Sequence, residues 1–285
     1  MEIQFNDKII KTEEKKKISE LLKEEIEKSK YTVIAAKFNN EYVNLDYIVE
    51  EDGKIELIDI SSREGMKVYT RTLTFILGKA FEKLYPNKKL NANYQLSNAM
   101  FYDILDMEVT EELVENIQKE MKEIIEKDLP IEQVIMNRKQ ATDFFSINDT
   151  SKGRLQLDLE NNDKIYMYYC ENYFNYCYGT LANRTGCVKK FEVAKYNDGF
   201  IIRYPSHKEP NHIAKFIKTK KLFWAIDEYE EIHRILNAER VFKLNDAIKE
   251  NRIKEIILLA EALHEKKIAN IADNIAKNKN IKMIL

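Results

Sequence analysis

The fold is decided by residues 71–86, which read Arg71-Thr-Leu-Thr-Phe75-Ile-Leu-Gly-Lys-Ala-Phe-Glu-Lys-Leu-Tyr-Pro86. This stretch predicts a helix from Tyr69 to Leu84. The helix should stop before Pro86, because proline has no amide hydrogen and clashes with the preceding turn. A second informative stretch lies further along the chain at residues 175–181.

The two stretches together resemble the editing domain of threonyl-tRNA synthetases. Residues 71–86 resemble its helix with an HxxxH pair, and Asn175-Tyr-Cys177-Tyr-Gly179-Thr-Leu181 resembles its partner motif D-L-C-R-G-P-H. The resemblance places the two helix histidines at Arg71 and Phe75. The motif's aspartate and histidine fall on Asn175 and Leu181. Only Cys177 keeps a ligand-type side chain, since phenylalanine and leucine cannot bind a metal and a protonated arginine repels one. The resemblance therefore implies an editing fold that has lost its chemistry.

The composition fits a protein with a buried core. The chain has 285 residues, of which 44% are hydrophobic and 33% charged, and this length predicts about two domains. The net charge of −2 does not favour non-specific electrostatic binding of nucleic acid, although a local basic surface is compatible with it.

The sequence gives no sign of export or of membrane insertion. No run approaches the roughly 18 apolar residues of a membrane span, and the N-terminus lacks the basic and apolar regions of a signal peptide. Cys170, Cys177 and Cys187 form an odd set within one short segment, which indicates reduced thiols. We therefore expect a cytoplasmic protein with no membrane partner.

Residues 1–62 have the pattern of a small β-grasp domain. Strands are expected at 1–5, 31–38 and 55–60, and a helix with apolar side chains at helical spacing is expected at 15–28. The segment resembles the ubiquitin-like TGS domain that precedes the editing domain in threonyl-tRNA synthetases.

Residues 63–205 resemble the second additional domain of threonyl-tRNA synthetases, here as a degenerate editing domain. We expect a helix over 111–127 capped by Thr110, a short helix over 138–145, and one or two aromatic strands within 166–178. With the first segment, this gives an α+β fold that joins a β-grasp domain to an editing-like α/β domain.

Residues 206–285 are expected to form a mostly helical connector. Its final apolar run, Ile281-Lys-Met-Ile-Leu285, predicts a buried strand, which we interpret as the first strand of an absent kinase domain.

The connector carries a second resemblance. Glu261 to Ala272 resembles the run E-A-L-H-E-K-K-I-A-x-I-A in bacterial uridine kinase-family proteins, which join a TGS domain, an editing-like domain and a connector to a phosphate-loop kinase. No GxxxxGK[ST] loop occurs in this chain. The resemblance thus assigns ATP and Mg²⁺ to the kinase domain of the parent protein and no cofactor to this chain.

The candidate site is the degenerate editing pocket. One interpretation is that its side chains only pack where a site once lay; the other is that Arg71, with Tyr102, binds a small anion or a nucleotide. No catalytic or metal-binding residue is predicted, because deacylation needs a positioned base or metal. The pocket residues are Arg71, Phe75, Tyr102, Asn175, Cys177 and Leu181.

Three hypotheses for function follow. The main one is a non-catalytic accessory region that positions or regulates the kinase domain of the same chain, which would phosphorylate uridine or a related nucleoside. The alternative is an RNA-binding module that holds a tRNA acceptor end without editing it. It would use contacts from Arg184, Lys189 and Lys190 and base stacking on an aromatic run that comprises Tyr166, Tyr168, Tyr169, Tyr173, Phe174, Tyr176 and Tyr178. The third is a residual aminoacyl-tRNA hydrolase. Each of the three hypotheses is compatible with a homo-oligomer.

Overall fold

The computed structural model describes residues 1–96, 98–147, 164–217, 220–239, 241–278 and 280. They divide into two compact units, of which the first comprises residues 1–139 and 164–216 and the second the remaining described residues. The mixed α+β architecture predicted from the sequence is confirmed. The strand expected at 281–285 lies outside the described residues. None of the described helices is both long and apolar enough to cross a membrane.

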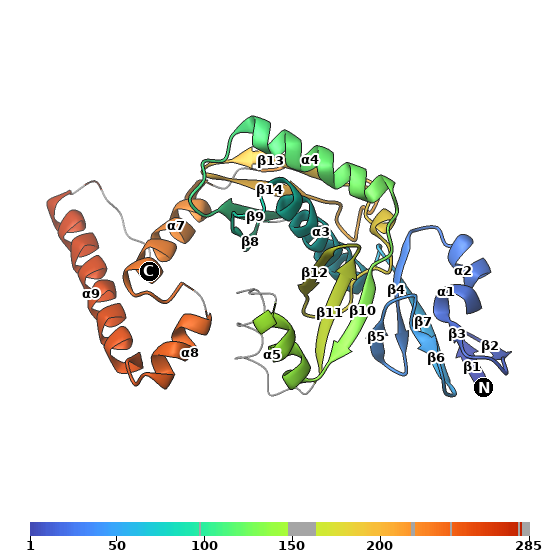
Figure 1. Ribbon diagram of the computed structural model, residues 1–285. Helices are drawn as coiled ribbons and strands as arrows, with labels where there is room; N and C mark the ends of the chain where they lie inside the picture. Colours follow the sequence, from blue (N-terminus) through green and yellow to red (C-terminus); the bar gives the residue numbers. More distant parts are fainter. Residues whose placement is uncertain (97, 148–163, 218–219, 240, 279, 281–285) are drawn as a thin grey trace. The chain divides into compact units, whose positions relative to one another are not determined.

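The first segment of the chain forms a mixed five-stranded sheet with the strand order β2-β1-β7-β4-β5 (Figure 1). β1 runs parallel to β7, and the other neighbours are antiparallel. Its assignment to a TGS domain stays a prediction. The strands are β1 (Glu2–Phe5), β2 (Lys8–Lys11), β4 (Val33–Phe38), β5 (Glu41–Val43) and β7 (Gly53–Asp59).

The single helix predicted over 15–28 is wrong. Two short helices, α1 (Ile18–Leu21) and α2 (Lys23–Glu27), meet at Leu22, whose φ of −114° and ψ of 27° leave the helical region. Two bonds of the helical pattern still reach Leu22, because its amide donates to the Ile18 carbonyl and its carbonyl accepts from the Ile26 amide, both at 2.9 Å. Ile18 and Leu22 are both fully buried. The chain before Ile18 is extended, because β3 (Lys16–Lys17) pairs with β6 (Ile48–Val49).

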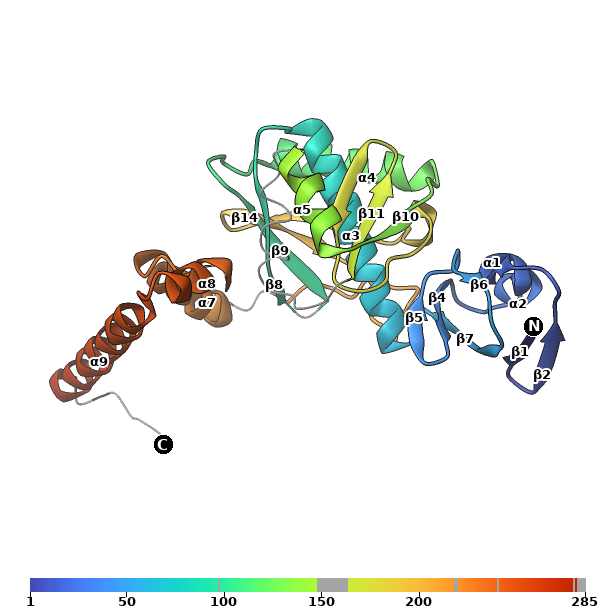
Figure 2. The same ribbon diagram turned by 60° about the horizontal axis from the view of Figure 1, so that its bottom comes forward.

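The helix that carries Arg71 is α3 (Arg63–Leu84), which begins earlier than the predicted Tyr69 and ends before Pro86 as predicted. The Ser62 hydroxyl caps it by accepting a hydrogen bond from the Gly65 amide at 3.0 Å. A Cβ on Gly65 would lie 1.9 Å from the carbonyl oxygen of Asp59. Figure 2 shows the start of α3 beside β4 and β7, so this helix grows directly out of the N-terminal sheet.

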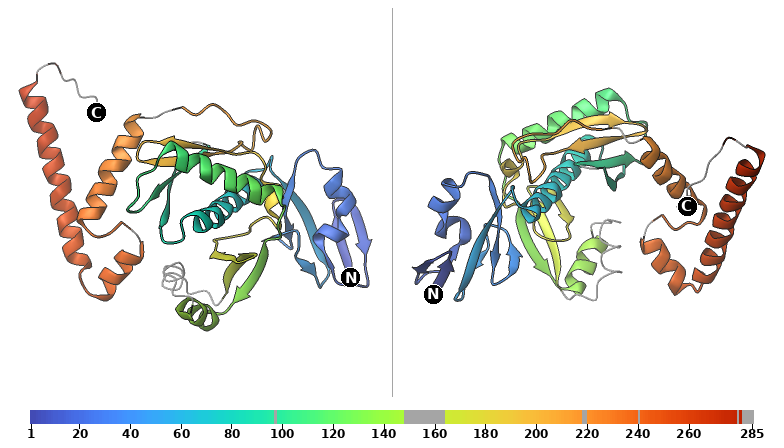
Figure 3. Two further views of the ribbon diagram at one scale, coloured as in Figure 1. Left: turned by 45° about the horizontal axis from the view of Figure 1, so that its top comes forward. Right: turned by 180° about the vertical axis from the view of Figure 1, so that it is seen from behind.

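The central part of the first unit is an antiparallel sheet in the order β13-β14-β9-β8, with α3 and α4 packed side by side on one face (Figure 3). The predicted cap is confirmed, because Thr110 Oγ1 accepts from the Leu113 amide at 3.2 Å. The elements are β8 (Leu90–Leu96), β9 (Ala99–Ile104), α4 (Glu111–Glu126), η1 (Thr185–Cys187), β13 (Glu192–Tyr196) and β14 (Gly199–Arg203).

A second antiparallel sheet, β10-β11-β12, lies beside the middle of α3. Its last two strands hold most of the aromatic run and confirm the prediction of strands there. Tyr168 and Tyr173 point into the molecule and are buried. The helix predicted over 138–145 is confirmed as α5. The elements are β10 (Glu132–Met136), α5 (Arg138–Ile147), β11 (Ile165–Cys170) and β12 (Tyr173–Tyr176).

The second unit is helical in its described part, as predicted. Its small core contains Leu236, Ala238, Ala247 and Ile256. Its helices after residue 216 are α7 (Lys220–Ile235), α8 (Val241–Lys249) and α9 (Ile253–Lys277).

Candidate functional site

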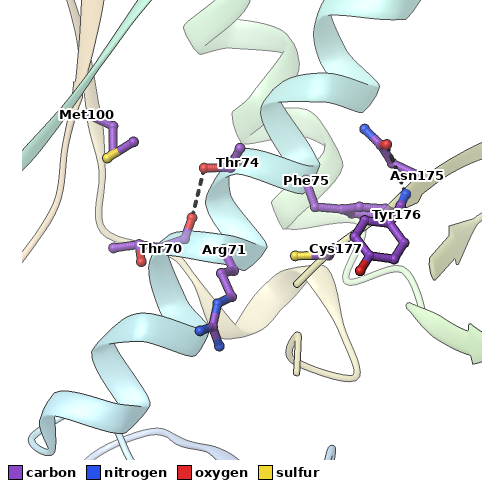
Figure 4. Close-up of a pocket in the computed structure, with 8 residues that line it drawn as sticks. All are labelled: Thr70, Arg71, Thr74, Phe75, Met100, Asn175, Tyr176 and Cys177. Atoms are coloured by element: carbon purple, nitrogen blue, oxygen red, sulfur yellow. Dashed lines mark hydrogen bonds between the residues drawn. The ribbon is translucent and has the colours of Figure 1, made fainter. Parts of the chain in front are cut away.

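A pocket of about 210 Å³ opens where α3 faces the end of β12 (Figure 4). α3 contributes one turn of side chains, β9 contributes Met100, and the chain at and just after the end of β12 contributes the rest. The two stretches singled out in the sequence therefore meet in space. The lining residues are Thr70, Arg71, Thr74, Phe75, Met100, Asn175, Tyr176 and Cys177.

Arg71 supplies the positive charge of this pocket. Its guanidinium extends from α3 away from the Phe75 ring and the Cys177 thiol (Figure 4). It lies against Gly179, where a Cβ would come within 2.8 Å of Nη1. Gly179 has a φ of +93°, which favours glycine. Among the residues that the structure describes, none accepts a hydrogen bond from Arg71 or forms an ion pair with it. The guanidinium is thus available to an anion.

Phe75 and Leu181 serve as core. Both are buried in one apolar cluster, at 4% and 0% exposure. The Phe75 ring lies edge-on to Tyr173 and Tyr168, with centroids 5.0 and 6.5 Å away. Leu181 does not line the pocket. At these two positions the structure therefore agrees with the interpretation that the side chains pack where a site once lay.

Cys177 lines the pocket, but it is not an activated nucleophile. Burial raises the pKa of its thiol to about 11, and the nearby Arg71 offsets this only in part. The thiol therefore stays protonated near neutral pH, and the thiolate is the reactive form.

Asn175 shapes the end of β12. Its Nδ2 donates to the Tyr173 hydroxyl at 2.9 Å, and its Oδ1 accepts from the Tyr176 amide at 2.9 Å. Both ends of the side-chain amide are thus bonded within β12, so Asn175 stabilises the conformation of the strand end.

Tyr102, predicted as a partner of Arg71, lies behind the pocket wall. It is 1% exposed, its ring stacks on Phe200, and its hydroxyl is 2.8 Å from Thr74 Oγ1. Thr74 faces the pocket in its place.

Four lining residues were not found from the sequence: Thr70, Thr74, Met100 and Tyr176. Thr70 and Thr74 are one helical turn apart, and this spacing next to Arg71 was the available signal. Met100 carried no such signal, because it reaches the pocket only through the pairing of β9 with β8 and β14.

The described side chains offer little for hydrolysis. No group of three or more histidine, cysteine, aspartate or glutamate side chains able to hold a metal occurs among the described residues. The pocket itself presents a guanidinium, two threonine hydroxyls, an amide, a thioether, a protonated thiol and two aromatic rings. That set can bind and orient a ligand, but it contains no group poised to take a proton near neutral pH.

Comparison with known proteins shows what part of this chain is related to. No family model matches the chain. The threonine–tRNA ligase of Fusobacterium nucleatum is 28% identical over 163 residues, which are 56% of this chain and 26% of that protein. The enzyme of Clostridioides difficile is 33% identical over 159 residues, 55% of this chain and 25% of its own. The enzyme of Clostridium tetani is 29% identical over 190 residues, which are 65% of this chain and 29% of that protein.

More than half of this chain is related to threonine–tRNA ligases. The predicted resemblance is confirmed to that extent. The chain spans about a quarter of the length of the curated relatives it matches. The resemblance to uridine kinase-family proteins stays a prediction.

Proposed function

We propose that this threonine–tRNA ligase-related region binds the 3′ end of an RNA without hydrolysing anything attached to it. The observation that carries the proposal is Arg71, which lines a pocket with no activated base or nucleophile and whose guanidinium has no hydrogen-bond acceptor or ion-pair partner among the described residues. The relatives are by name tRNA ligases, which favours tRNA as the RNA.

The charge pattern supports a local contact over a broad electrostatic surface. The net charge is −2, so binding should depend on a few phosphate contacts. Arginine suits this task, because its planar donors match phosphate oxygens in pairs.

Two of the cations first considered as RNA contacts are already engaged. Arg184 Nε donates to Asp128 Oδ2 at 2.7 Å. Lys190 Nζ donates to the backbone and side-chain oxygens of Asn211, each at 3.0 Å. Arg71 is therefore the better candidate for the phosphate contact.

The test is binding of deacylated tRNA to the whole chain, measured by fluorescence anisotropy at two salt concentrations. Arg71→Ala should weaken binding about tenfold to a hundredfold, as expected for a lost charge-assisted hydrogen bond. It should also lower the slope of log K against log salt by about 0.7. Arg63→Ala is the matched control, because it removes the same charge from an exposed position on the same helix. Equal affinity of the Arg71 variant and the unaltered chain would overturn the proposal.

A parallel assay addresses hydrolysis. Mischarged tRNA incubated with the chain should keep its amino acid, and Cys177→Ala should change nothing. Release of the amino acid that disappears in the Cys177 variant would instead establish a residual hydrolase.

A second candidate is a non-catalytic accessory region of a uridine kinase-like nucleoside kinase. It is supported by the run at 261–272, which lies on α9 in the second unit. It is also supported by the match to the three relatives, each of which leaves a third or more of this chain unmatched. The parent would use ATP and Mg²⁺. Sequencing the gene past the codon for Leu285 tests it: a Gly-rich loop ending in Gly-Lys-Ser or Gly-Lys-Thr supports the kinase, and an immediate stop codon overturns it.

A further inference from the structure

The segment 178–180 joins the Arg71 pocket to the N-terminal sheet. Gly179 lies against the Arg71 guanidinium. The next residue, Thr180, donates from its hydroxyl to the backbone carbonyl of Tyr42 at 3.0 Å. Tyr42 belongs to β5, the edge strand of that sheet. The pocket and the edge strand are thus joined through the two consecutive residues Gly179 and Thr180.

A second hydrogen bond fixes the same junction. Asn183 Nδ2 donates to Asp46 Oδ1 at 2.8 Å, and Asn183 itself is buried. Asp46 is in turn bonded by Lys17 and Ser19. Since all of these residues lie in the first unit, the junction is a built part of that unit.

Two exposed tyrosines belong to this junction, since Tyr178 lies in the segment itself and Tyr42 accepts the Thr180 hydrogen bond through its backbone carbonyl. Tyr178 and Tyr42 are each 48% exposed. The ring of Tyr178 is held by an edge-on contact with Tyr176, a pocket residue, at a centroid distance of 4.8 Å. Tyr42 has the Lys37 ammonium 5.5 Å from its ring centroid. Two exposed tyrosines, one of them with a lysine ammonium near its ring, therefore lie within a few residues of the contact between Gly179 and Arg71.

The size of the pocket limits what it can hold. Sites that enclose a whole small-molecule ligand usually have about 300 Å³ or more, and this pocket has about 210 Å³. A phosphate with its ribose fits such a volume better than a complete nucleotide does. A strand whose backbone contacts Arg71 would then place its bases outside the pocket, on the neighbouring surface.

We propose that Tyr178 and Tyr42 form a stacking surface for the bases of a single-stranded RNA end whose backbone contacts Arg71. This inference rests on the proposed function and extends it to a composite site shared by the N-terminal sheet and the segment after β12. Stacking on aromatic rings tolerates any base. The site should therefore prefer single strands over duplexes, in which the bases are already stacked, and should show little sequence preference.

The test uses a single-stranded RNA of about eight nucleotides, labelled at its 5′ end, and the whole chain. Tyr178→Ala and Tyr42→Ala should each weaken binding about tenfold, whereas Tyr178→Phe and Tyr42→Phe should keep it. Tyr229→Ala is the control, because Tyr229 is 59% exposed on α7 in the second unit. Melting temperatures of all variants show whether any loss comes from unfolding.

A second RNA isolates the base contribution. The same strand with abasic nucleotides at its 3′ end keeps the phosphates, so the unaltered chain should bind it about as weakly as the alanine variants bind the normal strand. The alanine substitutions should then have no further effect.

The outcomes separate the two proposals. If Arg71→Ala weakens binding but the tyrosine variants do not, the stacking surface is overturned and the proposed function stands. The stacking surface is also overturned if the phenylalanine variants, still folded, lose as much as the alanine variants. If Arg71→Ala has no effect, or the chain binds no RNA at all, both proposals fall.

Discussion

The side-chain hydroxyl of Thr72 accepts a hydrogen bond from the backbone amide of Ala182 at 2.9 Å, and both residues are fully buried. The same hydroxyl donates to the Val68 carbonyl at 2.8 Å. Thr72 follows Arg71 in the chain, and Ala182 follows Leu181. One buried hydroxyl therefore ties together the two stretches that enclose the pocket.

Replacing Thr72 by valine should destabilise the protein by about 1–3 kcal/mol, because valine keeps the shape but leaves the Ala182 amide without an acceptor. Urea unfolding measures the free energy. Thr70→Val is the control on the same helix, since the Thr70 hydroxyl bonds to the Lys67 carbonyl at an exposed place. If both variants lose the same stability, the link between the two stretches is not what holds the pocket.

Phe75→Ala should cost about 3–5 kcal/mol, because a buried ring that packs on Tyr168 and Tyr173 leaves a cavity. Phe75→Leu should cost much less, since it keeps most of the volume. Thermal and urea unfolding check both values. A neutral Phe75→Ala variant would show that this position is not core, and the packing interpretation would fail there.

Gly179→Ala should weaken RNA binding and lower stability by about 1 kcal/mol. The added Cβ meets the Arg71 guanidinium at 2.8 Å, and the φ of +93° is unfavourable for alanine. A double variant with Arg71→Ala removes the steric part and should be less destabilised than the two single effects summed. Simple additivity in unfolding experiments would mean that the two residues do not touch.

Alkylation of Cys177 should be slow at pH 7 and accelerate up to about pH 11, where its raised pKa lies. A variant with Cys170→Ala and Cys187→Ala isolates this thiol. The same variant unfolded in urea, where the thiol has a pKa of about 8.5, is the reference. A folded-state rate at pH 7 equal to that in urea would contradict the buried, protonated thiol.

The raised pKa of Cys177 also makes the free energy of unfolding depend on pH. The fold favours the protonated thiol, so its contribution is fully present below the unfolded pKa of about 8.5 and is lost as pH rises towards about 11. The free energy of unfolding should fall over that window, and it should fall less steeply in Cys177→Ala.

The helices show which local signals can be read from the sequence. Thr110 marks the start of α4, and Pro86 marks the limit of α3. The true start of α3 was missed, although Ser62 is a common capping residue. The interruption of the helix at Leu22 had no such signal, since neither glycine nor proline occurs within residues 15–28.

Most of the site could be predicted only from the resemblance to the editing domain, and the strand β8 was not predicted at all. β8 was missed because its side chains are mostly half-buried and lack a clean alternation of polar and apolar residues. Arg71, Phe75, Asn175 and Cys177 were brought together by a motif, and the structure places all four at one pocket. The motif does not show which side chains face the pocket, because packing decides this. Tyr102 lies behind Thr74 and does not line the pocket.

The growth of α3 straight out of the N-terminal sheet affects how the chain can be dissected. Ile34 and Ile58 of that sheet, and Ile60 just after β7, belong to the same apolar core as Met66 and Tyr69 of the helix. A fragment that starts at Arg63 would leave the helix residues of this core exposed, without the Ser62 cap. Such a fragment should aggregate when expressed alone. Limited proteolysis should likewise spare the peptide bonds around residue 62, even though two differently patterned stretches of sequence meet there.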